Sequence, residues 1–237
     1  DKAKRYNQPF YLYMAHYAIH VPVDKDMRFF PKYVRKGLSD KEAAYASLIE
    51  GMDKSLGDLL DWLDKNGEAD NTIVIFMSDN GGLAAEPEWR DGPKDTQNYP
   101  LNSGKGSMYE GGIREPMIVR WPGEVKAGSR CDDYLMIEDF YPTILEMAGV
   151  KKYTTVNPID GISFMPLLKQ TGHTPKGRSL VWNFPNIWGN DGAGINLNCA
   201  IRKDEWKLVY YYETGKKELF NIPNDIGEKD NQATRHP

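Results

Sequence analysis

The sequence of 237 residues has few cysteines, no long apolar run and no excess of positive charge. Its two cysteines, Cys131 and Cys199, are too few for a disulfide scaffold or a multi-cysteine metal cage, and two buried thiols are a simpler expectation than one bridge. No apolar run approaches the roughly 18 residues of a membrane helix, so we expect no membrane span. The 30 Lys and Arg residues stand against 34 Asp and Glu residues, which argues against a nucleic-acid partner.

Apolar residues make up 40% of the chain and charged residues 27%, which suffices for one large α/β domain or two small ones. A helix is predicted from Ser39, which forms a capping-box pattern with Glu42, to a stop near Gly67. The other elements predicted before residue 150 are a short aromatic strand at 10–15, a strand buried on both faces at 72–77, a strand at 117–121, and a helix at 137–149 that starts or is interrupted at Pro142.

This alternation of strands and helices predicts an α/β domain over residues 1–174, with a mostly parallel sheet sandwiched by helices. Short β-rich pieces follow at 179–184, 198–202, 206–212 and 217–221, with a hairpin turn at 213–216. They predict a small antiparallel α+β subdomain over residues 175–237. Ligands of parallel sheets bind at the carboxyl ends of the strands, where His20 and the Asp79-Asn80 pair are expected to lie.

Asp79 and Asn80 offer a carboxylate and an amide oxygen just after a predicted strand. Such hard oxygen donors suit Ca²⁺ or Mg²⁺ better than zinc, although calcium needs six to eight oxygens and hence further ligands. A plain turn explains the same residues equally well, because Asp, Asn and Gly are common turn residues.

Two of the four histidines, His16 and His20, flank one predicted strand end. Histidine can act as a general acid near neutral pH, although a lone histidine is more often structural or simply exposed. Lys105 lies in a glycine-rich stretch, 104–114, whose backbone N–H groups and cation could meet an anion. The stretch lacks the spacing of a phosphate-binding P-loop, and a flexible surface loop is the alternative. Trp188 could stack on a sugar ring.

Taken in order, four segments resemble the type I, formylglycine-dependent sulfatases of the alkaline-phosphatase superfamily. They are His-Tyr-Ala-Ile-His-Val-Pro at 16–22, Ser-Asp-Asn-Gly-Gly at 78–82, the lysine-to-Glu-Gly-Gly-Ile-Arg segment at 104–116, and the closing stretch at 207–221. The resemblance spans nearly the whole chain. It implies an alkaline-phosphatase-like fold and hydrolysis of sulfuric esters, with a sulfated sugar as the expected substrate.

The resemblance also implies roles for single residues. Asp79 and Asn80 would be ligands of one calcium ion. Lys105 would contact the sulfate and offset charge at the bridging oxygen, and His20 would contact the sulfate and protonate the leaving alcohol. His16 would border the substrate pocket, where the possible stacking residue Trp188 is also expected from its residue type. Glu110 and Arg114 match the motif and are expected to hold their loop.

The family's nucleophile is a formylglycine made in a Cys/Ser-x-Pro/Ala-x-Arg motif, which this sequence lacks, because Cys131 leads Asp-Asp-Tyr-Leu and Cys199 leads Ala-Ile-Arg-Lys. The paired aspartates that complete the family's calcium site are also absent. We therefore expect the C-terminal part of a larger enzyme, inactive by itself, whose N-terminal half supplies the formylglycine and the remaining ligands. Family habit places the parent in the periplasm or outside the cell.

Two alternatives remain open. A phosphate- or phosphonate-ester hydrolase of the same superfamily is the nearest, although those relatives often carry His where this chain has Asn80. A non-catalytic binding protein derived from a sulfatase is the other, and an upstream formylglycine motif would exclude it.

Overall fold

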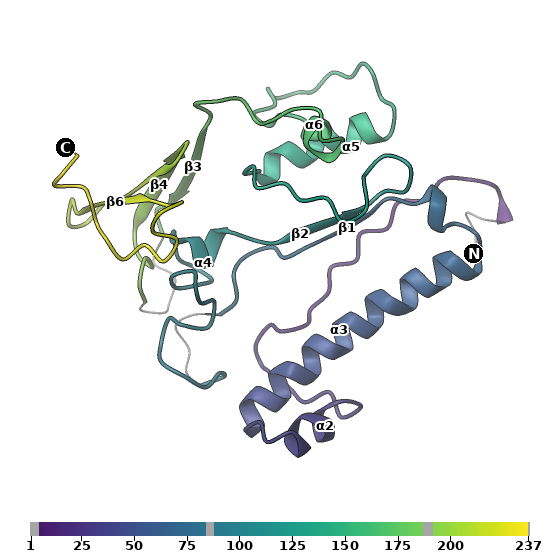
Figure 1. Cartoon of the computed structure of the whole chain (residues 1–237), viewed down its shortest axis with the longest axis horizontal. Helices are drawn as coiled ribbons and strands as arrows, with labels where there is room; N and C mark the ends of the chain where they lie inside the picture. The colour runs from purple at the N-terminus through teal and green to yellow at the C-terminus, as the bar shows by residue number, and fades with distance from the viewer. Residues whose placement is uncertain (1–4, 84–87, 187–191, 237) are drawn as a thin grey trace. The chain divides into compact units, whose positions relative to one another are not determined.

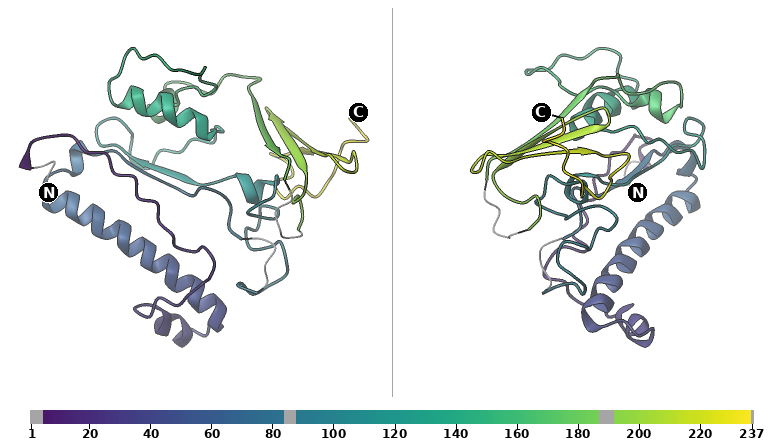
Figure 2. Two further views of the ribbon diagram at one scale, coloured as in Figure 1. Left: turned by 180° about the vertical axis from the view of Figure 1, so that it is seen from behind. Right: turned by 60° about the vertical axis from the view of Figure 1, so that its left-hand side comes forward.

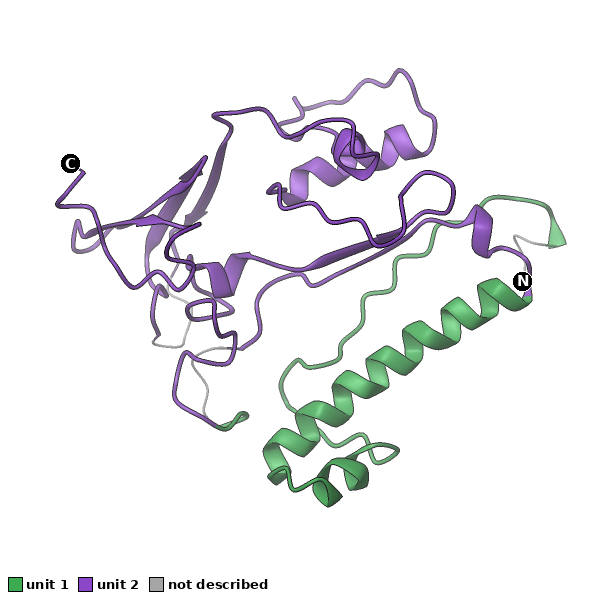
Figure 3. Ribbon diagram, in the orientation of Figure 1, with its two compact units in different colours: residues 1–65, 88–91 green, residues 66–87, 92–237 purple. Residues whose placement is uncertain are grey.

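The fold is that of a computed structural model, which describes residues 5–83, 88–186 and 192–236. The chain divides into two compact units, coloured separately in Figure 3. The first consists of residues 1–65 and 88–91, and the second of residues 66–87 and 92–237. No helix in the described ranges is long and apolar enough to cross a membrane.

The first unit is built around a long helix, α3 (Asp40–Lys65), which packs against the short helix α2 (Phe30–Arg35) (Figure 1). Phe30, Ala43 and Ala44 form its buried apolar cluster. The Ser39 Oγ accepts the Glu42 N–H at 3.3 Å, which confirms the predicted start of the helix. The Glu42 side chain accepts a hydrogen bond from the Arg90 Nε at 2.8 Å.

The predicted strand at residues 10–15 is wrong for the described chain. The segment is in neither of the two described sheets, and its side chains are exposed, Tyr11 and Tyr13 by 77% and 78%. The aromatic composition favours a strand, but a strand also needs a neighbouring backbone to pair with.

The second unit begins with β1 (Val74–Met77) and β2 (Met117–Arg120), which pair antiparallel with Ile75 opposite Val119. Both described sheets are antiparallel, so the parallel pairing predicted for this chain is not found among the described strands. A parallel pair is usually joined by a crossover helix that packs on the sheet, whereas the described part of the connection from β1 to β2 holds just the four-residue helix α4 (Glu110–Ile113). The side chains of β1 are half-buried, not buried on both faces as predicted.

Short helices follow β2 and lead to the second sheet. They are the 3₁₀ turn η2 (Ile137–Asp139), α5 (Phe140–Met147) and α6 (Met165–Leu168), and a further 3₁₀ turn, η1 (Ala69–Asn71), precedes β1. Pro142 lies in the first turn of α5, where its missing N–H costs no hydrogen bond. The helix predicted at 137–149 is confirmed over 140–147, and it starts before Pro142 and runs through it without a break.

The second sheet has the order β3-β4-β5-β6, all antiparallel, and is visible in yellow-green in Figure 2. Its strands are β3 (Ser179–Phe184), β4 (Asn198–Lys203), β5 (Trp206–Tyr211) and β6 (Lys217–Asn221), each within one residue of the prediction. One face buries Ala200, Val209 and Phe220 with Met108 and Tyr109 of the preceding loop. The sheet therefore packs on the segment that leads into α4.

Cys131 and Cys199 are free thiols. Cys131 is exposed in irregular chain between β2 and η2, so the expectation of a buried thiol is wrong there. Cys199 is partly buried on β4.

Candidate functional site

Two loops of the second unit meet at the end of β1. The strand ends at Met77, and Asp79 and Asn80 follow directly. The Lys105 N–H donates to the Gly82 carbonyl oxygen at 3.0 Å, and the Gly81 N–H donates to the Gly112 carbonyl oxygen at 3.1 Å. These bonds join the 78–82 loop to residues 102–114, which we call the glycine-rich loop.

Glycine is required where the two loops touch. A Cβ atom on Gly81 would lie 1.7 Å from the Gly111 carbonyl oxygen, which no packing adjustment could accommodate. Backbone can therefore approach backbone here, and the predicted oxygen ligands and Lys105 lie on adjoining loops.

Asp79 and Asn80 form a local polar cluster. Asp79 is exposed, and its Oδ1 accepts a hydrogen bond from the Asn80 Nδ2 at 3.2 Å. The Ser78 Oγ donates to the Asn80 carbonyl oxygen at 2.8 Å. Glu115 lies near enough for its charge to interact with that of Asp79. Burial, and then the Asp79 charge, raise the pKa of Glu115 to about 7, and its Oε1 is buried without a hydrogen-bond partner.

The donor chemistry of Asp79 and Asn80 fits a hard cation such as calcium, whose ligands in proteins are carboxylate and amide oxygens. Two side chains cannot complete a shell of six to eight oxygens. In the part of the chain that the structure describes, no group of three His, Cys, Asp or Glu side chains could hold a metal ion. The residues present therefore fit part of a calcium site.

His16 and His20 belong to the first unit, where both are exposed and line a pocket of about 550 Å³ with residues of α3. The His20 Nδ1 donates to the Val21 carbonyl oxygen at 2.8 Å, which leaves its Nε2 available for another partner. The His16 Nδ1 accepts the Ala18 N–H at 3.1 Å. Within the second unit the structure brings Asp79, Asn80 and Lys105 together. The roles of the two histidines stay predictions, and Trp188 lies outside the described residues.

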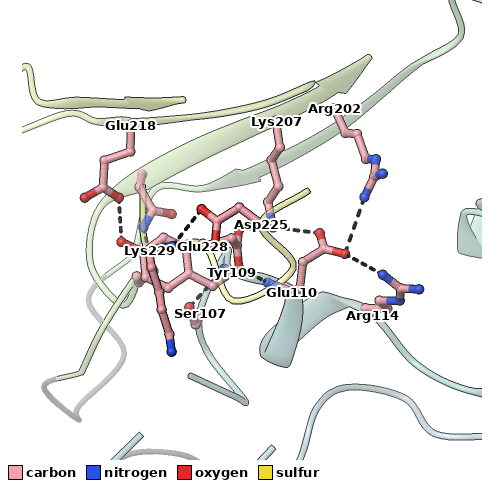
Figure 4. A network of polar contacts seen from close by, with 12 residues as sticks. Ser107, Tyr109, Glu110, Arg114, Arg202, Lys207, Glu218, Asp225, Glu228 and Lys229 are labelled. Atoms are coloured by element: carbon pink, nitrogen blue, oxygen red, sulfur yellow. Dashed lines mark hydrogen bonds and ion pairs between the residues drawn. The ribbon is translucent and has the colours of Figure 1, made fainter. Parts of the chain in front are cut away.

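A buried ion cluster beside the glycine-rich loop was not foreseen from the sequence (Figure 4). Lys207 on β5 has a fully buried side chain, with its Nζ 3.0 Å from Glu110 Oε1 and 2.8 Å from Glu228 Oε1. Arg202 of β4 and Arg114 lie 3.3 and 3.5 Å from Glu110 Oε2. The prediction that Glu110 and Arg114 hold the loop omitted the three partners that lie far along the sequence.

A second anchor lies next to this cluster. The Tyr109 hydroxyl donates to Glu218 Oε2 at 2.5 Å, and the Tyr211 hydroxyl donates to the same oxygen at 3.0 Å. Burial and the adjoining Glu218 raise the pKa of Tyr109, so the phenol stays a donor. The one sequence signal for these anchors is strand alternation, which puts Lys207 on the same face as Val209 and Tyr211.

Comparison with known proteins decides the family. Residues 1–150 match the family profile described as sulfatase, and residues 103–236 match the one described as N-sulphoglucosamine sulphohydrolase, C-terminal. The chain belongs to the sulfatase family. It is 34% identical to a sulfatase of Formosa agariphila over its whole length, and 32% identical over 96% of its length to human N-acetylgalactosamine-6-sulfatase. It spans only 44–45% of the length of these two relatives.

A solved structure shows the same fold. The crystal structure of Ps i-CgsB in complex with k-i-k-neocarrahexaose superposes with a TM-score of 0.82 at 30% identity, covering 99% of this chain and 48% of that one. The predicted alkaline-phosphatase-like α/β fold class is thereby confirmed.

Proposed function

We propose that this chain is part of a sulfatase that hydrolyses sulfate esters of sulfated carbohydrates. The observation that carries the proposal is that Asp79, Asn80 and Lys105 lie on hydrogen-bonded loops in a chain of the sulfatase family. The sugar substrate is supported by the relatives: one is named N-acetylgalactosamine-6-sulfatase, and the solved structure is a complex with k-i-k-neocarrahexaose.

The oxygens of Asp79 and Asn80 would hold part of a calcium ion's shell, and the bound cation would supply positive charge beside the sulfate oxygens. Lys105 adds a compact point charge on the adjoining loop, and it would offset negative charge that develops on the bridging oxygen as the ester bond breaks. A preorganised cation lowers the activation barrier because no free energy is needed to reorient it as the charge develops in the transition state.

His20 would contact the sulfate and donate a proton to the departing alcohol oxygen. Its Nδ1 is already engaged with Val21, so the Nε2 is the nitrogen left to carry that proton. His16 and Trp188 would border the sugar. The nucleophile, a formylglycine hydrate, would come from outside this sequence, and the complete gene product would be exported to the periplasm or secreted.

Parallel assays of the complete gene product test the reaction type. We expect turnover of a sulfate monoester to exceed that of the matched phosphate monoester. Asn80 offers the cation an oxygen donor, which suits calcium, where the phosphate- and phosphonate-hydrolysing relatives often carry a histidine that suits a transition metal. Turnover dominated by the phosphate or phosphonate ester would reject the proposal, and binding without turnover of either ester would favour a non-catalytic protein.

A further inference from the structure

Lys207 is a buried cation whose position is explained by the glycine-rich loop. Its side chain has no exposed surface and lies between two carboxylates, Glu110 at 3.0 Å and Glu228 at 2.8 Å. Burying an ammonium group is costly unless charged partners surround it. A methionine or leucine would fill the same position on β5 at less cost, so the charge calls for a reason beyond stability.

Glu110 is held through its side chain and its backbone by residues of the second sheet and of the chain that follows it. Its Oε1 meets Lys207 and its Oε2 meets Arg202, while its backbone N–H donates to Glu228 Oε2 at 2.6 Å. Figure 4 shows Lys207 and Arg202 reaching Glu110 from the sheet, and Glu228 reaching it from the loop after the sheet. The first residue of α4 is thus fixed in position and direction.

The fixed Glu110 is connected to Lys105 by short backbone bonds. The Gly111 N–H donates to the Asn102 carbonyl oxygen at 2.9 Å, and the Ser107 N–H donates to the Gly104 carbonyl oxygen at 2.9 Å. The Lys105 N–H donates a hydrogen bond to the Gly82 carbonyl oxygen. A shift of Glu110 would therefore move the turn that carries Lys105 relative to the 78–82 loop.

We propose that Lys207 is a positioning residue for the proposed sulfatase reaction. Through Glu110 it sets the place of Lys105, and it touches neither the sulfate nor the sugar. This inference rests on the proposed role of Lys105. A tight loop can be misplaced by a fraction of an ångström without unfolding, and such misplacement costs rate more than affinity for substrate.

A double-mutant cycle in the complete gene product tests the inference. The variants are Lys207→Met, Lys105→Ala and the two combined, and the readout is sulfate release from a sulfated sugar that the wild type hydrolyses. We expect Lys207→Met to lower kcat by about 10- to 100-fold with little change in KM. In the Lys105→Ala background the same change should add nothing, because the residue through which it acts is gone.

Lys203→Met is the matched control, since Lys203 is an exposed cation on β4 outside the cluster. It should leave kcat near the wild-type value. If circular dichroism shows that Lys207→Met does not fold, the cycle is run with Lys207→Met combined with Glu228→Gln, which removes the cation and one carboxylate together. Equal losses from the Lys207 change with and without Lys105 would overturn the inference.

Hydrogen exchange gives a readout that does not depend on activity. Amides of residues 105–112 should exchange faster in the Lys207 variant, whereas Ala200 and Val209 in the sheet should stay protected. Unchanged exchange in the glycine-rich loop would also overturn the inference. A wild type that releases no sulfate from any sulfated sugar would instead refute the proposed function, so the two failures are distinguishable.

Discussion

Single buried charges hold this chain together across long sequence distances. Asp139, with no exposed side-chain surface, receives two bonds from Arg178, at 2.6 and 2.8 Å, and further bonds from the backbone N–H groups of Met136 and Ile162. Burial alone would raise the pKa of Asp139, but these donors outweigh it and lower the pKa below its ordinary value of 3.8. The carboxylate is thus ionised in the folded chain and links η2 to the residues before β3.

Asp139→Asn should therefore lower the free energy of unfolding by about 3 kcal/mol at pH 7, because it leaves Arg178 with its charge unpaired. A group whose folded pKa is depressed stabilises the fold above its unfolded pKa and loses this effect as the pH falls through the folded value. The difference in the free energy of unfolding between wild type and variant should shrink below about pH 4. Urea unfolding at several pH values measures this difference, with the exposed Asp132→Asn as control. A difference that stays constant with pH would contradict a lowered pKa of Asp139 in the folded chain.

The Lys207 cluster shows why buried charges escape a reading of the sequence. A lysine on a strand is normally exposed, and its partners Glu110 and Glu228 are separated from each other by more than 100 residues. Alternation along β5 places Lys207 on the buried face, but only the fold reveals that two carboxylates lie against it. Asp79, Asn80 and Lys105 lie in local motifs from which a role can be predicted, and their roles stay predictions.

At the scale of elements, the periodic spacing of apolar residues predicted most of the helices and strands correctly. The 3.6-residue period found α3, and the short β-rich pieces found β3 to β6 almost to the residue. The predictions failed where pairing depends on chain that is distant in sequence: residues 10–15 have strand composition but no described partner, and β1 and β2 pair antiparallel. Periodicity shows which face of an element is apolar, and it does not show which neighbour covers that face.

The glycine-rich loop is the element most sensitive to a single methyl group. A Cβ on Gly112 would lie 2.2 Å from the Ser107 carbonyl oxygen and 2.5 Å from that of Gly104, so Gly112→Ala should destabilise the fold by about 2 kcal/mol or more. Gly57→Ala is the matched control, because Gly57 lies within α3 with no atom within 4 Å of the added methyl. That change should stabilise by about 0.5–1 kcal/mol.

Urea unfolding of the two alanine variants compares the predicted signs directly. A Gly112→Ala variant as stable as the wild type would show that the contact between the two turns of the loop is looser than described. The result bears on the site, because these turns carry Lys105.

At the scale of the whole molecule, the comparisons show the family and the fold class. The chain belongs to the sulfatase family, and it spans less than half the length of the curated relatives compared above. Asp79, Asn80 and Lys105 lie on adjoining loops of one compact unit, with the buried ion cluster behind them. We propose that these residues supply ligands and charge for the sulfatase reaction.

Sulfate release from a panel of sulfated sugars by the complete gene product tests this account most directly. We predict release that stops when calcium is removed by a chelator, returns when calcium is added back, and falls by about 100-fold or more in kcat/KM for Lys105→Ala. Release that continues unchanged in the chelator and in the Lys105→Ala variant would contradict the account.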